Sequence, residues 1–185
     1  MRTKRRRRKS RRVERLRRLF PDEVEYHRDD DFVVTCPTRL CFVPTPIDAV
    51  IRILEHLDPE PGTRVVDLGC GDGRFVAAAA YLYGCRGIGV DVREDVLQVA
   101  RRKCETLGVE DKTVFIRADV REVDLRGLRP DIVFVYLLPS LLRELSDDLA
   151  ACDATIVSYT FPIDSLGPPK VLKLDERRRA YVYER

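Results

Sequence analysis

Residues 65–75 read Val65-Val66-Asp67-Leu68-Gly69-Cys70-Gly71-Asp72-Gly73-Arg74-Phe75, with glycine at three alternate positions. An apolar, strand-like run precedes the glycines and an Ala-rich, helix-like run follows them. Glycine has no Cβ, so the chain can turn tightly there and a ligand can touch the backbone. The free N–H groups and the positive dipole end of the following helix suit a carboxylate or a phosphate. The pattern therefore predicts a ligand-binding turn between a strand and a helix.

The acids around this turn narrow the class of ligand. Residues 87–91 read as a strand ending in Asp91, an acid placed to bind a ribose diol. A dinucleotide fingerprint, G-x-G-x-x-G, needs glycine where the chain has Arg74. The G-x-G-x-G spacing, preceded by Asp67, resembles motif I of the class I S-adenosylmethionine (SAM) methyltransferases. In that superfamily Asp91 matches the ribose-binding acid, and Asp119 matches the acid that meets the adenine. The alternative is a glycine turn in an unrelated α/β domain.

Strand-like and helix-like runs alternate along most of the chain. Thr45 is expected to cap a helix that begins at Pro46 and ends near Leu57. Further helices are expected at 73–83, 93–107 and 139–151, and strands at 64–68, 86–91, 113–117, 131–136 and 154–159. A hairpin of 170–174 and 179–184 follows. This order predicts an α/β, Rossmann-like, doubly wound and mostly parallel seven-stranded sheet with an antiparallel C-terminal hairpin.

Charge is strongly segregated along the 185 residues. Residues 1–20 hold 12 Lys or Arg and one acid, for a charge of +11; the whole chain carries +3, so residues 21–185 carry −8. We expect a basic N-terminal arm at 1–20 and a SAM-dependent methyltransferase domain at 21–185. Such an arm favours contact with RNA, the ribosome or another acidic surface, and the alternative is a solubilising tail. Val13, Leu16 and Phe20 have near-helical spacing, so the end of the arm is expected to form a short helix.

Composition limits the compartment and the chemistry. No apolar run approaches the ~20 residues needed to span a bilayer, and the Arg-rich start has no apolar core of a secretory signal, so we expect no membrane partner. Six cysteines without a C-x-x-C pair make a zinc site unexpected and favour a reduced, cytoplasmic compartment. The absence of Asn and the 35% charged residues suggest a thermophile, with codon bias as the alternative.

A narrower resemblance rests on three stretches in order: residues 42–46, the glycine motif, and Tyr136-Leu137-Leu138-Pro139-Ser140. Together they resemble the archaeal broad-specificity protein lysine methyltransferases. They are also similar to mitochondrial relatives that modify the ATP synthase c subunit and the ADP/ATP carrier. The resemblance covers roughly residues 40–185 and implies a protein substrate that presents a lysine, with no metal. It implies that SAM is held by Thr45, Asp67, Gly69, Gly71, Asp72, Gly73, Asp91 and Asp119, with Asp67 near the SAM amine.

The end of the fourth expected strand is the place for the target amine. The Asn-Pro-Pro-Tyr sequence of many base and glutamine methylating enzymes is absent there. A lysine ε-amine has a pKa of about 10.4 in water and attacks only when neutral. An apolar opening to the binding site, here called the mouth, excludes water and so lowers the pKa of the amine. An aromatic face in the mouth can hold the ammonium. We expect Tyr136, with Leu137 and Leu138, to form such a mouth and Tyr136 to be catalytic; an ordinary strand-end role is the alternative. An RNA methyltransferase and a non-catalytic SAM-binding module remain as alternative functions.

Overall fold

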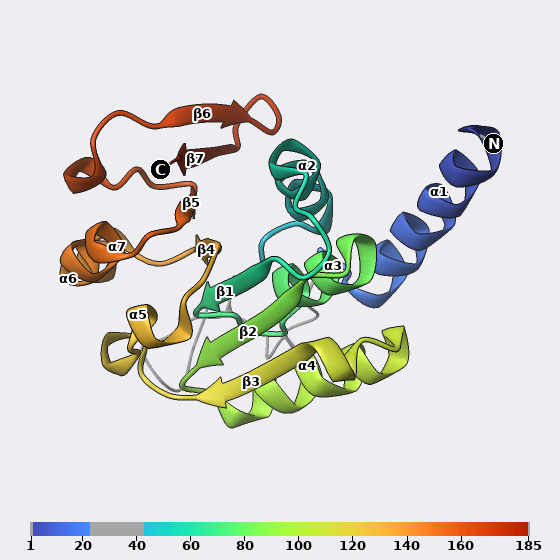
Figure 1. Cartoon of the computed structure of the whole chain (residues 1–185), viewed down its shortest axis with the longest axis horizontal. Coiled ribbons are helices and arrows are strands. Elements are labelled where there is room, and N and C mark those ends of the chain that lie inside the picture. Colours follow the sequence, from blue (N-terminus) through green and yellow to red (C-terminus); the bar gives the residue numbers. More distant parts are fainter. Residues whose placement is uncertain (1, 23–42, 185) are drawn as a thin grey trace, which may run out of the picture.

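A computed structural model describes residues 2–22 and 43–184. Its seven strands form one mixed sheet in the order β3-β2-β1-β4-β5-β7-β6 (Figure 1). The strands are β1 (Arg64–Leu68), β2 (Arg86–Asp91), β3 (Thr113–Arg117), β4 (Ile132–Val135), β5 (Thr155–Tyr159), β6 (Lys170–Lys173) and β7 (Arg179–Tyr183). Strands β1 to β5 are parallel, whereas β7 is antiparallel to both β5 and β6. The predicted fold class, including the C-terminal hairpin, is confirmed.

Helices cover both faces of the sheet, as expected for a doubly wound fold. The helices are α1 (Arg2–Leu19), α2 (Ile47–Leu57), α3 (Arg74–Tyr83), α4 (Glu94–Leu107), α5 (Leu125–Leu128), α6 (Pro139–Glu144) and α7 (Ser146–Ala151). Alternate residues of β1 divide between the two cores. Val65 belongs to the core with α1 to α4, and Val66 and Leu68 belong to the core with α5 to α7. Strand β1 is therefore buried on both sides, which explains the apolar residues Val65, Val66 and Leu68 on its two faces.

Two expectations about helices are wrong. The helix expected at 139–151 is divided at Leu145 into α6 and α7. The Ser146 hydroxyl donates to the Arg143 carbonyl at 2.8 Å, a local bond that competes with regular helix geometry. Thr45 does not cap α2, because the residue before the helix is Pro46. The first helical N–H, that of Ile47, donates to Asp22 Oδ1 at 2.8 Å instead.

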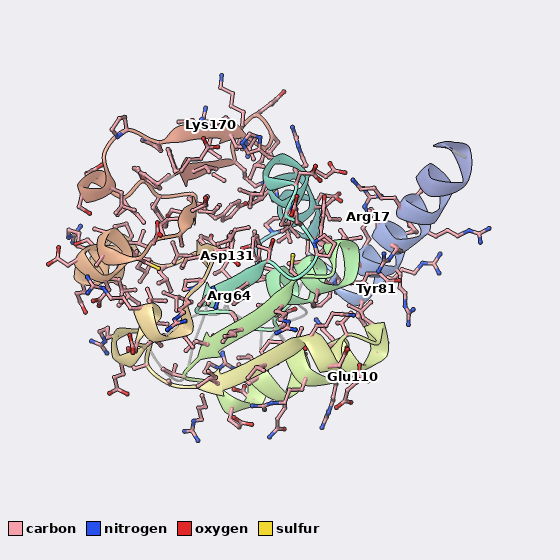
Figure 2. The ribbon with its side chains drawn as sticks, in the orientation of Figure 1. Arg17, Arg64, Tyr81, Glu110, Asp131 and Lys170 are labelled. Atoms are coloured by element: carbon pink, nitrogen blue, oxygen red, sulfur yellow. The ribbon has the colours of Figure 1, made fainter. Side chains whose placement is uncertain are left out.

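Helix α1 is longer than expected, and its end is part of the main core. Leu16 and Phe20 are completely buried among residues of α2 and α3. Arg12 donates to the carbonyl of Tyr81 and packs against the Tyr81 ring; Figure 2 shows Tyr81 beside α1. Arg15 donates to the carbonyl of Thr106. Both carbonyls lie in the last turns of α3 and α4, where the negative dipole ends of these helices favour a cation.

Some predictions depend on residues outside the described ranges. Cys36, Cys41 and His27 lie there, whereas Cys70, Cys85 and Cys104 are free and buried, and Cys152 is buried. No cluster of His, Cys, Asp or Glu able to hold a metal ion occurs within the described residues. Among the helices in those ranges, none is both long and apolar enough to cross a membrane.

Candidate active site

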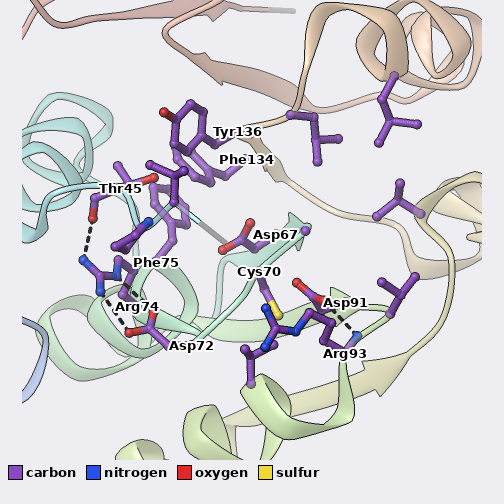
Figure 3. A pocket seen from close by; sticks show the side chains of 18 of the residues that line it. Thr45, Asp67, Cys70, Asp72, Arg74, Phe75, Asp91, Arg93, Phe134 and Tyr136 are labelled. Carbon is purple, nitrogen blue, oxygen red and sulfur yellow. Dashed lines mark hydrogen bonds and ion pairs between the residues drawn. The ribbon is translucent and has the colours of Figure 1, made fainter. Parts of the chain in front are cut away.

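A cavity of about 210 Å³ opens at the carboxyl ends of β1, β2 and β4. In a doubly wound sheet this is where ligands bind. Seven of the nine predicted site residues line the cavity: Thr45, Asp67, Gly69, Asp72, Asp91, Asp119 and Tyr136. Gly71 and Gly73 are not among the lining residues. Figure 3 shows the side chains of Asp67 and Asp91 on the cavity wall.

The two glycines that do not line the cavity shape the turn. Gly73 precedes α3 with φ +72°, and a Cβ on it would lie 2.8 Å from both Ala100 and the Phe115 ring. Only glycine therefore lets the loop pack this closely against α4 and β3. Gly71 also has a positive φ, +51°, and its N–H donates to Asp91 Oδ2 at 2.9 Å. These glycines position the loop rather than form the cavity wall.

Asp67, at the penultimate position of β1, is a buried acid facing the cavity. It is 3% exposed, and its carboxyl has no hydrogen-bond partner within the described part of the chain. Burial raises its pKa well above the usual value for aspartate, and the charges of Asp91 and Asp72 raise it further. A buried polar group without a partner is costly. A ligand ammonium placed beside Asp67 would satisfy it.

Asp72 has the opposite environment. Burial alone would raise its pKa, but hydrogen bonds and charge from Arg74 and Lys103 lower the pKa below the usual value. Arg74 makes a two-pronged contact, Nε to Oδ1 and Nη2 to Oδ2, both 2.9 Å long. Lys103 Nζ lies 2.7 Å from Oδ2. Asp72 is thus a permanently ionised member of a buried ion cluster at the cavity wall.

The acids expected at the ribose and adenine are also held by the chain. Asp91 Oδ1 accepts from the N–H of Arg93 at 2.9 Å, so both of its oxygens are fixed by main-chain donors. Asp119 caps the short helix after β3 and receives Arg121 Nε at 2.9 Å and Nη2 at 2.6 Å. Hydrogen bonds from Arg121 lower the pKa of Asp119 to about 2. A ligand amine at Asp119 would share it with Arg121.

Aromatic side chains form the end of the cavity nearest β4. Phe75 and Phe134 stack with centroids 4.0 Å apart, and Tyr136 meets Tyr159 edge to face at 4.8 Å. Tyr136 and Leu137 line the cavity, as predicted for an apolar mouth. Leu138 does not line the cavity, and its side chain is 64% exposed. The mouth is therefore more aromatic than the sequence indicated.

Several lining residues were not predicted. Arg74, Arg93 and Arg121 bring cationic side chains to a cavity that was expected to be acidic. Arg74 directly follows the last glycine of the motif, and from the sequence it indicated only that a dinucleotide-binding fingerprint is absent. Its position two residues after Asp72 in the sequence was the available signal. For Phe75, the stacking on Phe134 joins residues far apart in the chain, so no local pattern could have revealed it.

The sheet order, the glycine turn after β1 and the acids at the carboxyl ends of β1, β2 and β3 define a class: this is a Rossmann-like, SAM-dependent methyltransferase. The buried, unpartnered carboxyl of Asp67 fits the cationic amine of SAM. Residues 67–170 match the ANTKMT methyltransferase domain, and the chain belongs to that family.

Individual relatives agree on the methyltransferase class. The chain is 29% identical to a protein-lysine N-methyltransferase of Saccharolobus islandicus, over 77% of this chain and 91% of the relative. It is 35% identical to the mouse adenine nucleotide translocase lysine N-methyltransferase, over 66% of this chain but only 54% of that protein. A solved structure of an RNA methyltransferase from Salinibacter ruber, in complex with S-adenosyl-L-homocysteine, has 33% identity and a TM-score of 0.71. That alignment covers 76% of this chain and 92% of the other.

Proposed function

We propose that this chain transfers a methyl group from SAM to the ε-amine of a lysine in a protein. The observation that carries the proposal is the aromatic mouth at the end of β4, where Tyr136 lines the cavity and Asn-Pro-Pro-Tyr is absent. The family and the lysine-methylating relatives support the same substrate class. We further propose that the methyltransferase domain comprises residues 21–185, with the buried side chains of Leu16 and Phe20 packed against it.

The cavity residues would contact three regions of the methyl donor. Asp67 and Thr45 would hold the methionine end, and Gly69 would leave room for it. Asp91 would accept from the ribose hydroxyls, since each of its oxygens keeps a free lone pair beside its main-chain donor. Asp119 would accept from the adenine amine. SAM supplies an electrophilic methyl group on a sulfonium.

The chain's own part in the reaction is to orient and dehydrate the amine. The faces of Tyr136 and its aromatic neighbours attract an ammonium. The low polarity of the mouth favours the neutral amine, so the lysine ammonium releases one proton to solvent before methyl transfer. The amine nitrogen then forms the new N–C bond as the C–S bond breaks, giving a methylated lysine and S-adenosylhomocysteine. Positioning for in-line transfer is the main contribution of such a site.

A second candidate, RNA methylation, is favoured by one specific observation. The alignment with the Salinibacter ruber structure, which is described as an RNA methyltransferase, covers 92% of that protein's chain. The basic residues of 1–20 suit the same partner. The missing Asn-Pro-Pro-Tyr counts against methylation of a base amine but leaves ribose or carbon methylation possible.

We also propose that the basic arm at residues 1–20 contacts RNA or the ribosome whichever substrate is methylated. Some of its charge is already used within the protein: Lys9 pairs with Glu55 at 3.2 Å, and Arg17 pairs with Asp48 at 2.8 Å. Residues 2–8 contribute a further six Lys or Arg.

Deletion of residues 1–8 removes these charges and keeps Leu16 and Phe20. It should weaken RNA binding and flatten its salt dependence. Equal RNA affinity of the full-length and shortened chains at each salt concentration would reject the contact.

Transfer of a labelled methyl group into a cell lysate decides between the substrates. Lysate treated with protease should lose the label and lysate treated with nuclease should keep it. The opposite result would establish the RNA candidate. No label in either fraction, together with measurable SAM binding, would indicate a non-catalytic SAM-binding module.

A further inference from the structure

The guanidinium of Arg74 joins three separate parts of the chain. Its side chain is 4% exposed. Beside its two contacts with Asp72, Nη1 donates to the Thr45 carbonyl at 2.8 Å and Nη2 donates to the Pro21 carbonyl at 3.3 Å. The guanidinium is planar and its donors have fixed directions. One side chain thus sets the relative positions of the glycine loop, the segment before α2 and the residue that follows Phe20.

Phe20 covers the ion cluster that Arg74 belongs to. Lys103 Nζ, which contacts Asp72, lies 4.3 Å from the centroid of the Phe20 ring, and Arg74 Cζ lies 5.8 Å from it. Phe20 is completely buried. The ring therefore excludes water from the cluster and attracts both cations through its face. Loss of water strengthens the attraction between Asp72 and its partners.

Asp22 ties the same segment to α2. Its Oδ1 accepts from the N–H of Ile47 at 2.8 Å and lies 4.0 Å from Arg74 Nη1. The segment from Leu16 to Asp22 is thus attached both to the first turn of α2 and to the ion cluster. Thr45, Asp72 and Arg74 at the other side of these contacts line the cavity (Figure 3). The groups that dock the end of α1 are the groups that form the cavity wall.

We propose that Arg74 is a positioning residue that couples the docking of residues 16–22 to the binding of the methyl donor. When Phe20 and Pro21 are docked, Arg74 holds Asp72 and Thr45 where the donor needs them. Because coupling between two sites is reciprocal, a bound donor also holds residues 16–22 in place. The inference rests on the proposed placement of the donor in this cavity.

Affinity measurements on matched variants test the coupling. Phe20→Leu removes the ring from Lys103 and Arg74 but leaves an apolar residue in the core. Leu149→Val is the control, since Leu149 is equally buried but belongs to the core on the other face of the sheet, outside residues 16–22 and outside the ion cluster. Calorimetry with S-adenosylhomocysteine should give an affinity lowered at least about fivefold in Phe20→Leu, the lower end of typical site coupling. Leu149→Val should bind like the natural chain. Equal affinity in the natural chain and Phe20→Leu, or an equal loss in both variants, would overturn the coupling.

A second measurement works even if a variant folds poorly. In the natural chain, S-adenosylhomocysteine should slow amide hydrogen exchange across residues 16–22. Arg74→Lys keeps the charge but cannot make the two-pronged contact and both carbonyl contacts at once, so this slowing should be lost. Unchanged exchange in the natural chain with the ligand bound would refute the coupling. Failure of the natural chain to bind the ligand at all would instead refute the donor site itself.

Discussion

The N–H of Gly71 donates to Asp91 Oδ2 at 2.9 Å, so the acid that ends β2 also holds the glycine loop that follows β1. The second oxygen of Asp91 takes the N–H of Arg93, at the start of α4. Asp91 therefore has two roles: it faces the cavity, and it fixes the loop that forms the cavity floor. A substitution at Asp91 should therefore affect both ligand binding in the cavity and the position of the glycine loop.

Replacement of Asp91 tests its part in donor binding. Asp91→Ala should lower SAM affinity at least about tenfold, because a hydrogen bond to a charged group contributes about 1.5–3 kcal/mol. Asp91→Asn retains one oxygen acceptor and should lose less. Calorimetric titration of both variants with SAM is the measurement. Natural affinity in Asp91→Ala would remove this residue from the donor site.

The buried carboxyl of Asp67 should destabilise the ligand-free protein at neutral pH. Its pKa is raised in the folded chain, so its contribution to stability is complete below the unfolded pKa and is lost as the pH rises through the folded pKa. Asp67→Asn should therefore raise the melting temperature by a few degrees at neutral pH and change it little in acid. The same variant should bind SAM less well. Thermal unfolding at a series of pH values checks the first part, and a melting temperature lowered equally at every pH would contradict it.

Donor binding should release a proton from Asp67. The raised pKa favours the protonated carboxyl in the empty cavity, and an ammonium beside it favours the carboxylate. Calorimetry in two buffers with different ionisation enthalpies measures the release directly. Asp67→Asn, which has no proton to lose, is the matched control. The same proton count in both proteins would place the donor's amine elsewhere.

Tyr136 should affect turnover more than donor affinity. Loss of the ring in Tyr136→Ala removes an aromatic face worth about 0.5–2 kcal/mol to a cation, so kcat/KM for the lysine substrate should fall up to roughly thirtyfold. Tyr136→Phe keeps the face and should keep most of the activity. Rates with a lysine-containing protein and SAM affinities should be measured on the same preparations. If Tyr136→Phe is as slow as Tyr136→Ala, the hydroxyl rather than the ring is required.

The sequence predicted the sheet well because strand order follows from local patterns and general connection rules. Strands β1, β2 and β3 begin and end at the expected residues, since each is an apolar run bounded by glycine or charge. Donor-site residues near the glycine motif were predictable for the same reason. The acids Asp67, Asp91 and Asp119 each follow or end such a run, so their meeting at one sheet edge is a consequence of parallel topology.

What the sequence did not indicate depends on contacts between distant residues. The burial of Phe20 against Lys103, and the cap that Asp22 provides for Ile47, join segments with no shared local pattern. A run of Lys and Arg with few apolar residues is typical of a tail, and only the packed neighbours reveal that Leu16 and Phe20 are core residues. The break at Leu145 was hidden because Ser146 is tolerated in a helix interior.

The docking of α1 has a consequence for the order in which the chain can fold during synthesis. Arg15 and its partner Thr106 are 91 residues apart, and Arg12 and Tyr81 are 69 apart. At about 5–20 residues per second, Leu16 and Phe20 leave the ribosome seconds before α3 and α4 exist to cover them. The surrounding Lys and Arg repel other copies of the same segment and so act as gatekeepers against aggregation in that interval. The positive charge around these two core residues would therefore also protect the segment during the delay before it is buried.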